Sequence, residues 1–373
     1  MPVGPLAEWP GADGTVLAEQ SEPTKQPTVV ADAINDRAAV RFDGNDDRLA
    51  LVDNPFADAA TPRTLFVAFT SNDYQGHLIG TGADTAGQFM ARGFGVGVAA
   101  NKPFVKARSS SNGVWLLSPE NMKNRGPQLL SASVASTGSE IRTGCHITNS
   151  STTPAPAVYP TAHIGGTVDG AESFAGDIAE ILLYDRILTA DEHASVWNYL
   201  ADKYGIEIPA SVDTDNNGVF DACDTGAVYL KAPDISVALV PPTVLHQGEI
   251  ANIIDAPSPT AADPHSDATH VWVKGTPELL FDLKADYQLE TIHFWNYNTE
   301  GFDVDSIEFE FLNAGEEVIS ELTVTPQTGF ENILAEDFPI DVSGVRYVRA
   351  TLTATNNEVE FQNMGFSGIP EAE

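Results

Sequence analysis

The residues whose types and spacing point most clearly to chemistry lie in a twelve-residue stretch near the middle of the chain, residues 213–224. Oxygen-bearing side chains stand at positions 1, 3, 5, 9 and 12 of this stretch, and they are Asp213, Asp215, Asn217, Asp221 and Asp224. Gly218 stands at position 6, where such a loop turns sharply. Because a hard cation needs several oxygens that converge on one point, this spacing predicts a calcium site. The alternative is an acidic hinge that holds no ion.

The residues that follow the loop lack an amphipathic helical period, so neither a paired EF-hand nor a dockerin is expected. The segment DTDNNGVFDACD instead resembles a single thrombospondin type 3 repeat. Loops of that family wrap calcium with little regular structure and stiffen the junction between modules. The resemblance implies that the five side chains above are ligands and that the Val219 carbonyl is a sixth. The family strings many repeats together, whereas this chain has one.

The charge balance of the chain limits its partners. Asp and Glu number 53 against 19 Lys and Arg among 373 residues, a formal net charge of −34. Nucleic acids and anionic membrane surfaces attract basic patches, so neither is an expected partner. No apolar run approaches the roughly 20 residues that span a bilayer, so membrane insertion is not expected. The start of the chain lacks a signal-peptide pattern. Since millimolar calcium is extracellular, we expect a secreted or cell-surface protein whose signal is absent from this sequence.

The chain has two cysteines, Cys145 and Cys223, which allow at most one intramolecular disulfide. Cys223 lies inside the calcium loop and Cys145 lies well before it. The pair could bridge the loop to the first part of the chain, or both could be free thiols.

Residues 1–209 predict one β-rich domain. Short apolar and β-branched runs recur between Gly, Asn, Asp and Pro, at 39–42, 64–70, 77–79, 94–98, 114–117 and 128–134. This spacing favours a sandwich or jelly roll of antiparallel sheets. One helix is predicted near the end, with Thr189 as its N-cap and Gly205 as its last residue. Its predicted apolar stripe consists of Val196, Tyr199, Leu200 and Tyr204.

Two segments of this domain, VRFDGNDDRLAL and HIGGTVDGAESFAGDIAEILLYDRILTADEHASVWNYLADKYGIEIP, resemble the laminin G-like branch of the concanavalin A-like jelly rolls. That family implies the fold and, often, recognition of glycans or proteins, without a single ligand.

The same domain contains candidate catalytic carboxylates. Jelly-roll glycosidases pair two carboxylates on one strand face, and the nearest candidates here are Glu172, Asp177 and Glu180. Asp177 and Glu180 differ by three positions, so a regular strand would point them to opposite faces. We therefore expect them to be structural. Nucleophile, phosphate-loop and zinc-protease motifs are absent from the sequence, although a polysaccharide lyase with dispersed residues would leave no local motif.

The second part, residues 227–369, shows period-two alternation that predicts a second antiparallel β-sandwich. In residues 306–311, Ile307, Phe309 and Phe311 should face a core while Glu308 and Glu310 face water. Further strands are predicted at 278–283, 290–295, 344–353 and 359–366.

The order of segments in this part resembles the discoidin-like family, which includes coagulation-factor C domains and galactose-binding modules. The resemblance rests on Asn252, Asp255, Thr269 and Trp272, on the ELLFDL strand and on the terminal EVEFQNMGF strand. Members that bind sugars often hold a structural calcium between the opening loop and an acidic residue of the last strand. Asp255 and Glu360 are the matching positions here.

Ligands of that family lie on loops at one end of the sandwich, where aromatic rings stack on sugars and amides bond hydroxyls. The candidate contact residues are Trp295, Asn296, Tyr297, Asn298 and Glu300. The alternative for Trp295 and Tyr297 is a packing role in the core. Asp263, His265, Asp267 and His270 could instead form a zinc site or a plain polar loop.

The sequence therefore predicts an all-β protein with a laminin G-like domain (1–209), a calcium linker (210–226) and a discoidin-like domain (227–369). We expect a non-catalytic extracellular protein that binds polysaccharide or glycan, with Ca²⁺ ordering its structure. The first alternative is an adhesion segment of a larger surface protein that binds protein partners or other domains. The second is a polysaccharide lyase or glycoside hydrolase.

Overall fold

The computed structural model describes residues 2–58, 61–71, 75–81, 93–109, 112–122, 125–167, 173–209, 213, 219–263, 270–299, 301–329 and 333–371. The chain divides into two compact units, Met1–Cys223 and Asp224–Glu373, referred to below as unit 1 and unit 2. None of the helices in the described ranges is long and apolar enough to cross a membrane.

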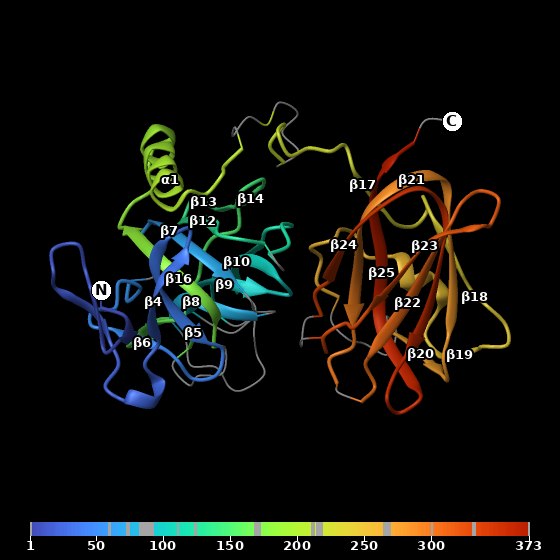
Figure 1. Ribbon diagram of the computed structural model, residues 1–373, viewed down its shortest axis with the longest axis horizontal. Coiled ribbons are helices and arrows are strands. Elements are labelled where there is room, and N and C mark those ends of the chain that lie inside the picture. Colours follow the sequence, from blue (N-terminus) through green and yellow to red (C-terminus); the bar gives the residue numbers. More distant parts are fainter. Residues whose placement is uncertain are drawn as a thin grey trace. The chain divides into compact units, whose positions relative to one another are not determined.

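Unit 1 contains two antiparallel sheets of eight strands each (Figure 1). Sheet A has the order β1 (Gly4–Pro5), β4 (Thr28–Ile34), β5 (Arg37–Asp43), β16 (Ala175–Tyr184), β7 (Arg63–Ser71), β12 (Gln128–Ala135), β13 (Gly138–Arg142), β14 (Ile147–Ser150). Sheet B has the order β11 (Asn112–Leu117), β10 (Lys102–Ser109), β9 (Gly93–Ala99), β8 (Gln75–Thr81), β15 (Ala162–Ile164), β6 (Leu49–Leu51), β3 (Val16–Glu19), β2 (Glu8–Pro10). A short 3₁₀ turn, η1 (Pro23–Lys25), precedes β4.

Strand β7 lies at the centre of sheet A and is buried on both faces. Val67 and Phe69 contribute to the core that the strands of both sheets share, whereas Phe66 and Ala68 pack with residues of the helix α1 (Ala190–Tyr204). This explains why 64–70 forms an apolar run without alternation, since a strand covered on both faces has no solvent side. Sheet A therefore has an inner, core face and an outer face that carries α1.

Helix α1 begins and ends where the sequence predicts. Thr189 and Glu192 form a capping box, and Gly205 closes the helix in the left-handed conformation (φ 58°). The predicted stripe is only partly correct, because Tyr199 is 47% exposed and Val196 is only partly buried. The buried residues are His193, Trp197, Leu200, Ala201 and Tyr204.

Unit 2 is built around one continuous antiparallel sheet of nine strands. Its main order is β19 (Leu245–Gln247), β20 (Val271–Lys274), β25 (Glu358–Pro370), β21 (Glu278–Asn296), β24 (Glu336–Thr353), β22 (Ser306–Leu312), β23 (Val318–Val324). Strand β17 (Val228–Leu230) pairs with β25, and β18 (Ser236–Leu239) pairs with β21. The turn η2 (Ile250–Ile254) precedes the opening loop, residues 255–263.

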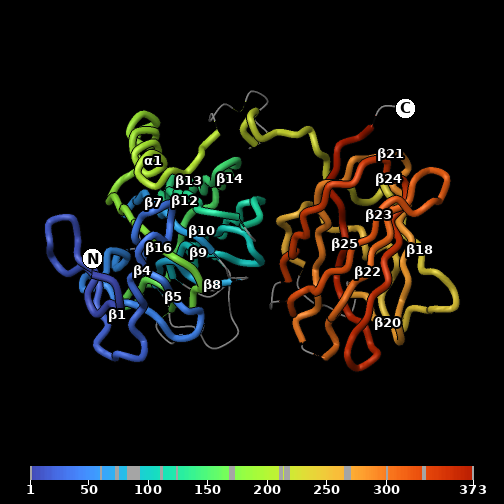
Figure 2. The backbone as a smooth tube through the Cα atoms, viewed as in Figure 1, coloured from blue at the N-terminus to red at the C-terminus, as the bar shows by residue number. Residues whose placement is uncertain are grey.

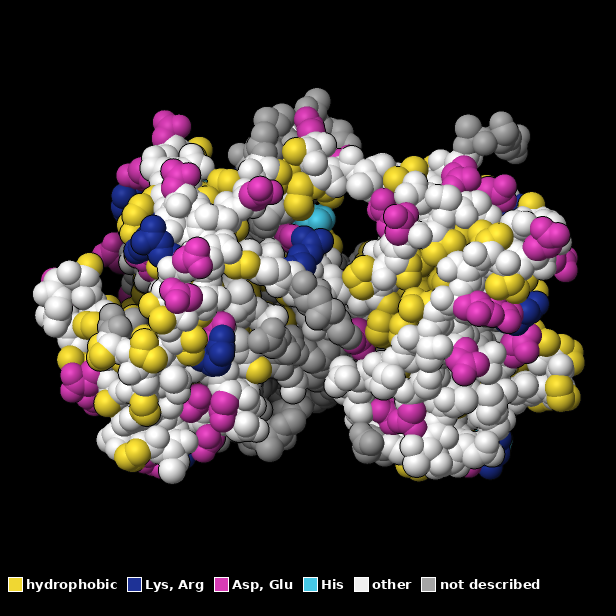
Figure 3. Space-filling view, in the orientation of Figure 1, with side chains coloured by type: hydrophobic (Ala, Val, Ile, Leu, Met, Phe, Trp, Pro, Cys, Tyr) yellow, Lys and Arg dark blue, Asp and Glu magenta, His cyan; other side chains and the backbone are white. Residues whose placement is uncertain are grey.

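The long strands β21, β24 and β25 lie side by side (Figure 2) and have bulged registers. All three contribute side chains to the larger hydrophobic cluster of unit 2. The predicted alternation in β22 is confirmed, because Ile307, Phe309 and Phe311 are buried while Glu308 is exposed. The predicted class, all-β with antiparallel sheets and one short helix among the described residues, is confirmed. Asp and Glu side chains are spread over the visible face of each unit (Figure 3).

Candidate ligand-binding and metal sites

The loop between β21 and β22, residues 297–305, is held by the buried side chain of Asn296. Its Nδ2 donates to the carbonyls of Val304 and Gln327, each at 3.0 Å. Its Oδ1 accepts from the backbone N–H groups of Tyr297 (2.9 Å) and Val304 (2.8 Å). A buried amide with four such bonds fixes both ends of the loop and attaches it to the segment that follows β23.

Two buried carboxylates tie the same segments together. Asp303 accepts from the Thr328 hydroxyl (2.6 Å) and from the Gly301 N–H (3.0 Å). Glu336 accepts from the Gln327 N–H (2.8 Å). Hydrogen bonds within the protein therefore hold the described residues of the β21–β22 loop in place.

Phe302 is the large apolar side chain that this loop exposes, at 39%. Its carbonyl accepts from the Glu360 N–H at 2.8 Å, which places the loop beside the start of β25. The sequence reasoning missed Phe302. The available signal was its place between Gly301 and Asp303, before the alternation of β22 begins, where no core position is expected.

Two of the residues predicted to contact a ligand are buried in the protein instead. Trp295 is fully buried among Ala256, Ile333 and Ala335, and its Nε1 donates to the Ala261 carbonyl at 2.8 Å. The ring has no free face for a sugar, so the packing alternative describes it. Asn296 is likewise engaged internally.

The remaining candidates are on the loop itself. Tyr297 is partly buried and packs against the cluster around Trp295, as the packing alternative expects. Asn298 is partly exposed, and Glu300 lies outside the described residues.

The opening loop brings oxygen atoms together beside β25. The Asn363 Oδ1 accepts from the Asp255 N–H (3.1 Å), and the Asn363 Nδ2 donates to Asp263 (2.5 Å). Burial raises the pKa of both carboxyls, and the charge of Asp255 raises that of Asp263 further. The polar neighbours of Asp255 thus include Asn363, Asp263 and the Tyr229 hydroxyl. Glu360 lies opposite Trp272 in the ladder and is 8% exposed.

Of the residues considered for zinc, Asp263 makes the contacts above and His270 is buried. His265 and Asp267 lie outside the described residues, so the zinc alternative stays a prediction.

The predicted calcium loop, residues 213–224, is called the central loop below. The part of it that follows residue 218 is anchored to unit 1. Cys145 and Cys223 form a disulfide, which decides between the two alternatives left open by the sequence. The Phe220 N–H donates to the Cys145 carbonyl at 2.9 Å, and Val219 forms a single β-bridge with His146. Of the predicted calcium ligands, Asp213, Val219, Asp221 and Asp224 are described, whereas Asp215 and Asn217 lie outside the described residues.

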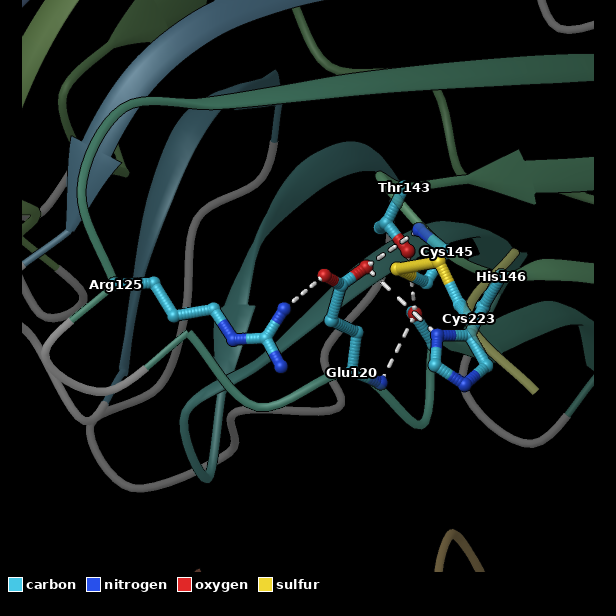
Figure 4. Close-up of a disulfide and its surroundings, with 7 residues drawn as sticks. Glu120, Arg125, Thr143, Cys145, His146 and Cys223 are labelled. Carbon is cyan, nitrogen blue, oxygen red and sulfur yellow. Dashed lines mark hydrogen bonds and ion pairs between the residues drawn. A yellow bond between two sulfur atoms is a disulfide. The ribbon is translucent and has the colours of Figure 1, made fainter. Parts of the chain in front are cut away.

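Glu120 is a buried carboxylate beside this disulfide (Figure 4). It pairs with Arg125 and accepts from the Cys145 N–H at 3.3 Å. His146 Nδ1 is 3.8 Å away, so its contribution is mainly electrostatic. Burial by itself would raise the pKa of Glu120. The interactions with His146, Thr143 and Arg125 outweigh burial and hold that pKa below its usual value. Glu120 thus stays ionised and fixes the turn that carries Cys145.

A further acidic group, Asp43, Asp46 and Asp47, lies at the end of β5 and in the turn after it, and was not predicted as a metal site. One oxygen from each lies within 4.8 Å of the others. Burial and the charge of Asp43 raise the pKa of Asp47 to about 6. Asp43 accepts the N–H groups of Asn45 (2.8 Å), Asp46 (3.3 Å) and Asp47 (3.4 Å). These bonds account for the turn without an ion.

Two of the three candidate catalytic carboxylates, Asp177 and Glu180, are in structural ion pairs. A bulge between Ile178 and Glu180 breaks the alternation of β16, and both Ile178 and Ile181 pack into the core. Asp177 and Glu180 therefore face the same outer side, contrary to the prediction of opposite faces.

Each of these two carboxylates has a cation. Asp177 binds Arg41 through two bonds of 2.7 and 2.8 Å, and Glu180 binds Lys203 at 2.8 Å. Glu172 lies outside the described residues.

Comparison with known proteins gives no match to a family model and none to a curated protein. Solved structures that are similar to this chain are discoidin-like, F5/8 type C carbohydrate-binding domains. The family 32 carbohydrate-binding module of C. perfringens NanJ, solved with galactose, is 14% identical, covers 38% of this chain and 98% of its own, and has a TM-score of 0.27.

Two further structures are comparable. A fucose-binding module of Streptococcus pneumoniae is 12% identical, covers 38% of this chain and 94% of its own, and has a TM-score of 0.28. The F5/8 type C domain of a Bacteroides fragilis protein is 12% identical, covers 38% of this chain and 99% of its own, and has a TM-score of 0.25. At these values the likeness carries no functional argument for this chain.

Proposed function

We propose that this chain is a non-catalytic extracellular carbohydrate-binding protein, and that unit 2 contacts glycan through its β21–β22 loop. The observation that carries the proposal is Phe302, an exposed aromatic ring on a loop that buried Asn296 and Asp303 hold in place. A ring of this kind stacks on the C–H face of a sugar. The order of the loop before binding lowers the entropy cost of recognition.

Polar groups on the same loop supply the orientation that stacking lacks. Asn298 is partly exposed and offers an amide that can donate to and accept from sugar hydroxyls. Tyr297 and Glu300 stay in the proposed contact set as flanking groups. The bound ligand would thus be a polysaccharide or a glycan chain.

Calcium belongs to the proposal at two places. The central loop, with Asp213, Asp221 and Asp224 among its ligands, would hold one ion. The opening loop would hold another, where Asp255 and Asp263 repel each other and a cation would relieve that repulsion. Glu360 remains the proposed ligand from the last strand.

An extracellular location is supported by the disulfide between Cys145 and Cys223, because structural disulfides persist mainly in oxidising compartments.

The test is a binding screen of the full chain against neutral and charged polysaccharides, with calcium and again with a chelator. Phe302→Ala and Asn298→Ala should each weaken binding about three- to tenfold, from the loss of ring stacking or of a hydrogen bond. The matched control is Ile319→Ala, another exposed apolar side chain (42%) of unit 2. It lies beside the β22–β23 turn, at the other end of β22 from the loop.

Binding that needs calcium and weakens in the two loop variants, but not in the control, would support the proposal. A folded protein that binds no glycan in either condition would refute it. A protein partner whose binding free sugars do not compete away would favour the adhesion alternative.

A further inference from the structure

Unit 1 carries a polar groove on the outer face of sheet A, beside the start of α1. Two hollows of about 580 and 520 Å³ make up this groove. Arg142, Ala190 and His193 line both hollows, so the two hollows adjoin. Volumes of this size fall within the range of small-molecule sites, about 300–1,000 Å³.

The floor of the groove is a row of hydrogen-bonding side chains from three neighbouring strands. Ser133 of β12 pairs with Glu140 of β13, and Glu140 pairs with Asn149 of β14. Val134 and Ile141 belong to the core between the sheets, so their neighbours Ser133 and Glu140 face the groove. The row places a hydroxyl, a carboxylate and an amide side by side at the spacing of adjacent strands, about 4.8 Å.

Arg142 lies on the same face, two residues beyond Glu140. Its Nη2 is 3.6 Å from the Glu140 Oε1, too long for a full hydrogen bond. Its Nε is buried and has no hydrogen-bond partner among the described residues. The guanidinium lies 5.8 Å from the centre of the Phe220 ring, which is itself buried next to the disulfide. Phe220 thus positions an arginine whose donors are not fully used.

The other wall comes from α1 and is mostly neutral. Asp191, Trp197 and Asn198 line it. His193 pairs with the Ser131 hydroxyl at 2.8 Å, and burial followed by the charge of Arg142 lowers its pKa to about 4. His193 is therefore uncharged at neutral pH.

The charges of the groove select against anionic ligands. Arg142 is the cation among the lining residues, which also include two carboxylates, Glu140 and Asp191. The formal charge of the chain, −34, also repels polyanions. A ligand that matches this set has many hydroxyls and no charge.

We infer that this groove binds a neutral oligosaccharide. Glu140 accepts hydrogen bonds from sugar hydroxyls, Asn149 and Ser133 both donate and accept, and Arg142 donates to ring or hydroxyl oxygens. The site is in the other unit from the β21–β22 loop and does not depend on the function proposed for that loop. The protein would then have one glycan-binding site in each unit.

The experiment uses the full chain with Phe302→Ala, so that the loop of unit 2 contributes as little as possible. Binding is measured by titration calorimetry against neutral hexasaccharides of glucan, mannan, galactan and xylan, and against sulfated and uronate oligomers. Asn149→Ala should weaken binding of the neutral oligomer about three- to tenfold, and Glu140→Gln about tenfold, as the second removes a charge-assisted bond. Asn149 is exposed, so its variant should fold as the parent does.

The control is Asn112→Ala, which removes an exposed amide from β11 in sheet B, outside the groove. A neutral oligomer that binds the parent and the control but weakens in both groove variants would support the inference. It is overturned if the folded parent binds no neutral oligomer, if only anionic oligomers bind, or if neither groove variant changes the affinity. A loss caused by Phe302→Ala alone would bear on unit 2 and not on the groove.

Discussion

Removal of the disulfide should destabilise unit 1 and leave unit 2 unchanged. Cys145 and Cys223 are separated by 78 residues in the sequence. For a loop of that length the chain-entropy relation gives about 4.5 kcal/mol at 25 °C, and measured effects of such bridges are typically about 2–4 kcal/mol. The double variant Cys145→Ser, Cys223→Ser should therefore lower the unfolding free energy of unit 1 by about 2–4.5 kcal/mol. The contact of Phe220 with Arg142 should loosen with it.

The two units must be measured separately, because a two-unit chain does not unfold in a single transition. Urea-dependent hydrogen exchange with mass spectrometry does this, since peptides report on one unit at a time. The urea concentration at which peptides from β12, β13 and β14 lose half of their exchange protection should fall. The same concentration for peptides from β21 and β25 should stay unchanged. Wild-type protein treated with a reductant is the control and should match the double variant. A decrease of less than about 1 kcal/mol in the unfolding free energy of unit 1 would refute the view that the disulfide holds the end of the central loop in place.

The structure fixes the direction of three other changes in stability. Asn296→Ala should destabilise unit 2 by about 2–4 kcal/mol, measured by urea unfolding, because it leaves several buried backbone groups unpaired. Burial lowers the pKa of His193 from an ordinary 6.5 to about 4. Between pH 6.5 and 4, the imidazole is therefore protonated in the unfolded chain but not in the folded one. Unit 1 should thus lose up to roughly 3 kcal/mol as pH falls from 6.5 to 4, and His193→Gln should remove that part of the loss. Burial raises the pKa of Asp47 from 3.8 to about 6. The protonated carboxyl therefore stabilises the folded state fully below pH 3.8, and this contribution is lost as the pH rises through 6. Asp47→Asn should therefore stabilise unit 1 by about 1–2 kcal/mol at pH 7 in chelator and have no such effect at pH 3.5, measured by urea unfolding.

Features set by neighbouring residues were predictable from the sequence. The alternation of Ile307, Phe309 and Phe311 gave the buried face of β22. Thr189 and Gly205 gave the ends of α1, because a cap depends on residues within one turn of the helix.

Features that depend on the register of strands were not predictable in the same way. The bulge after Ile178 turned Asp177 and Glu180 to the same face, and Lys203 of α1 then paired with Glu180. No local pattern announces one extra residue in a strand. Likewise the apolar stripe of α1 was misplaced at Tyr199, because the stripe is set by where the helix lies on sheet A.

By itself the sequence determined the all-β class, the length and caps of one helix, and a loop with the ligand spacing for calcium, since each follows from periodicity or spacing within a dozen residues. Only the tertiary structure decided which distant groups meet. It brought Asn363 to Asp263 across 100 residues and Phe220 to Arg142. It also buried Trp295 under the opening loop and left Phe302 exposed. The physical reason is that burial and side-chain contact are properties of the packed chain, and a residue's type fixes what it can bond but not what lies beside it.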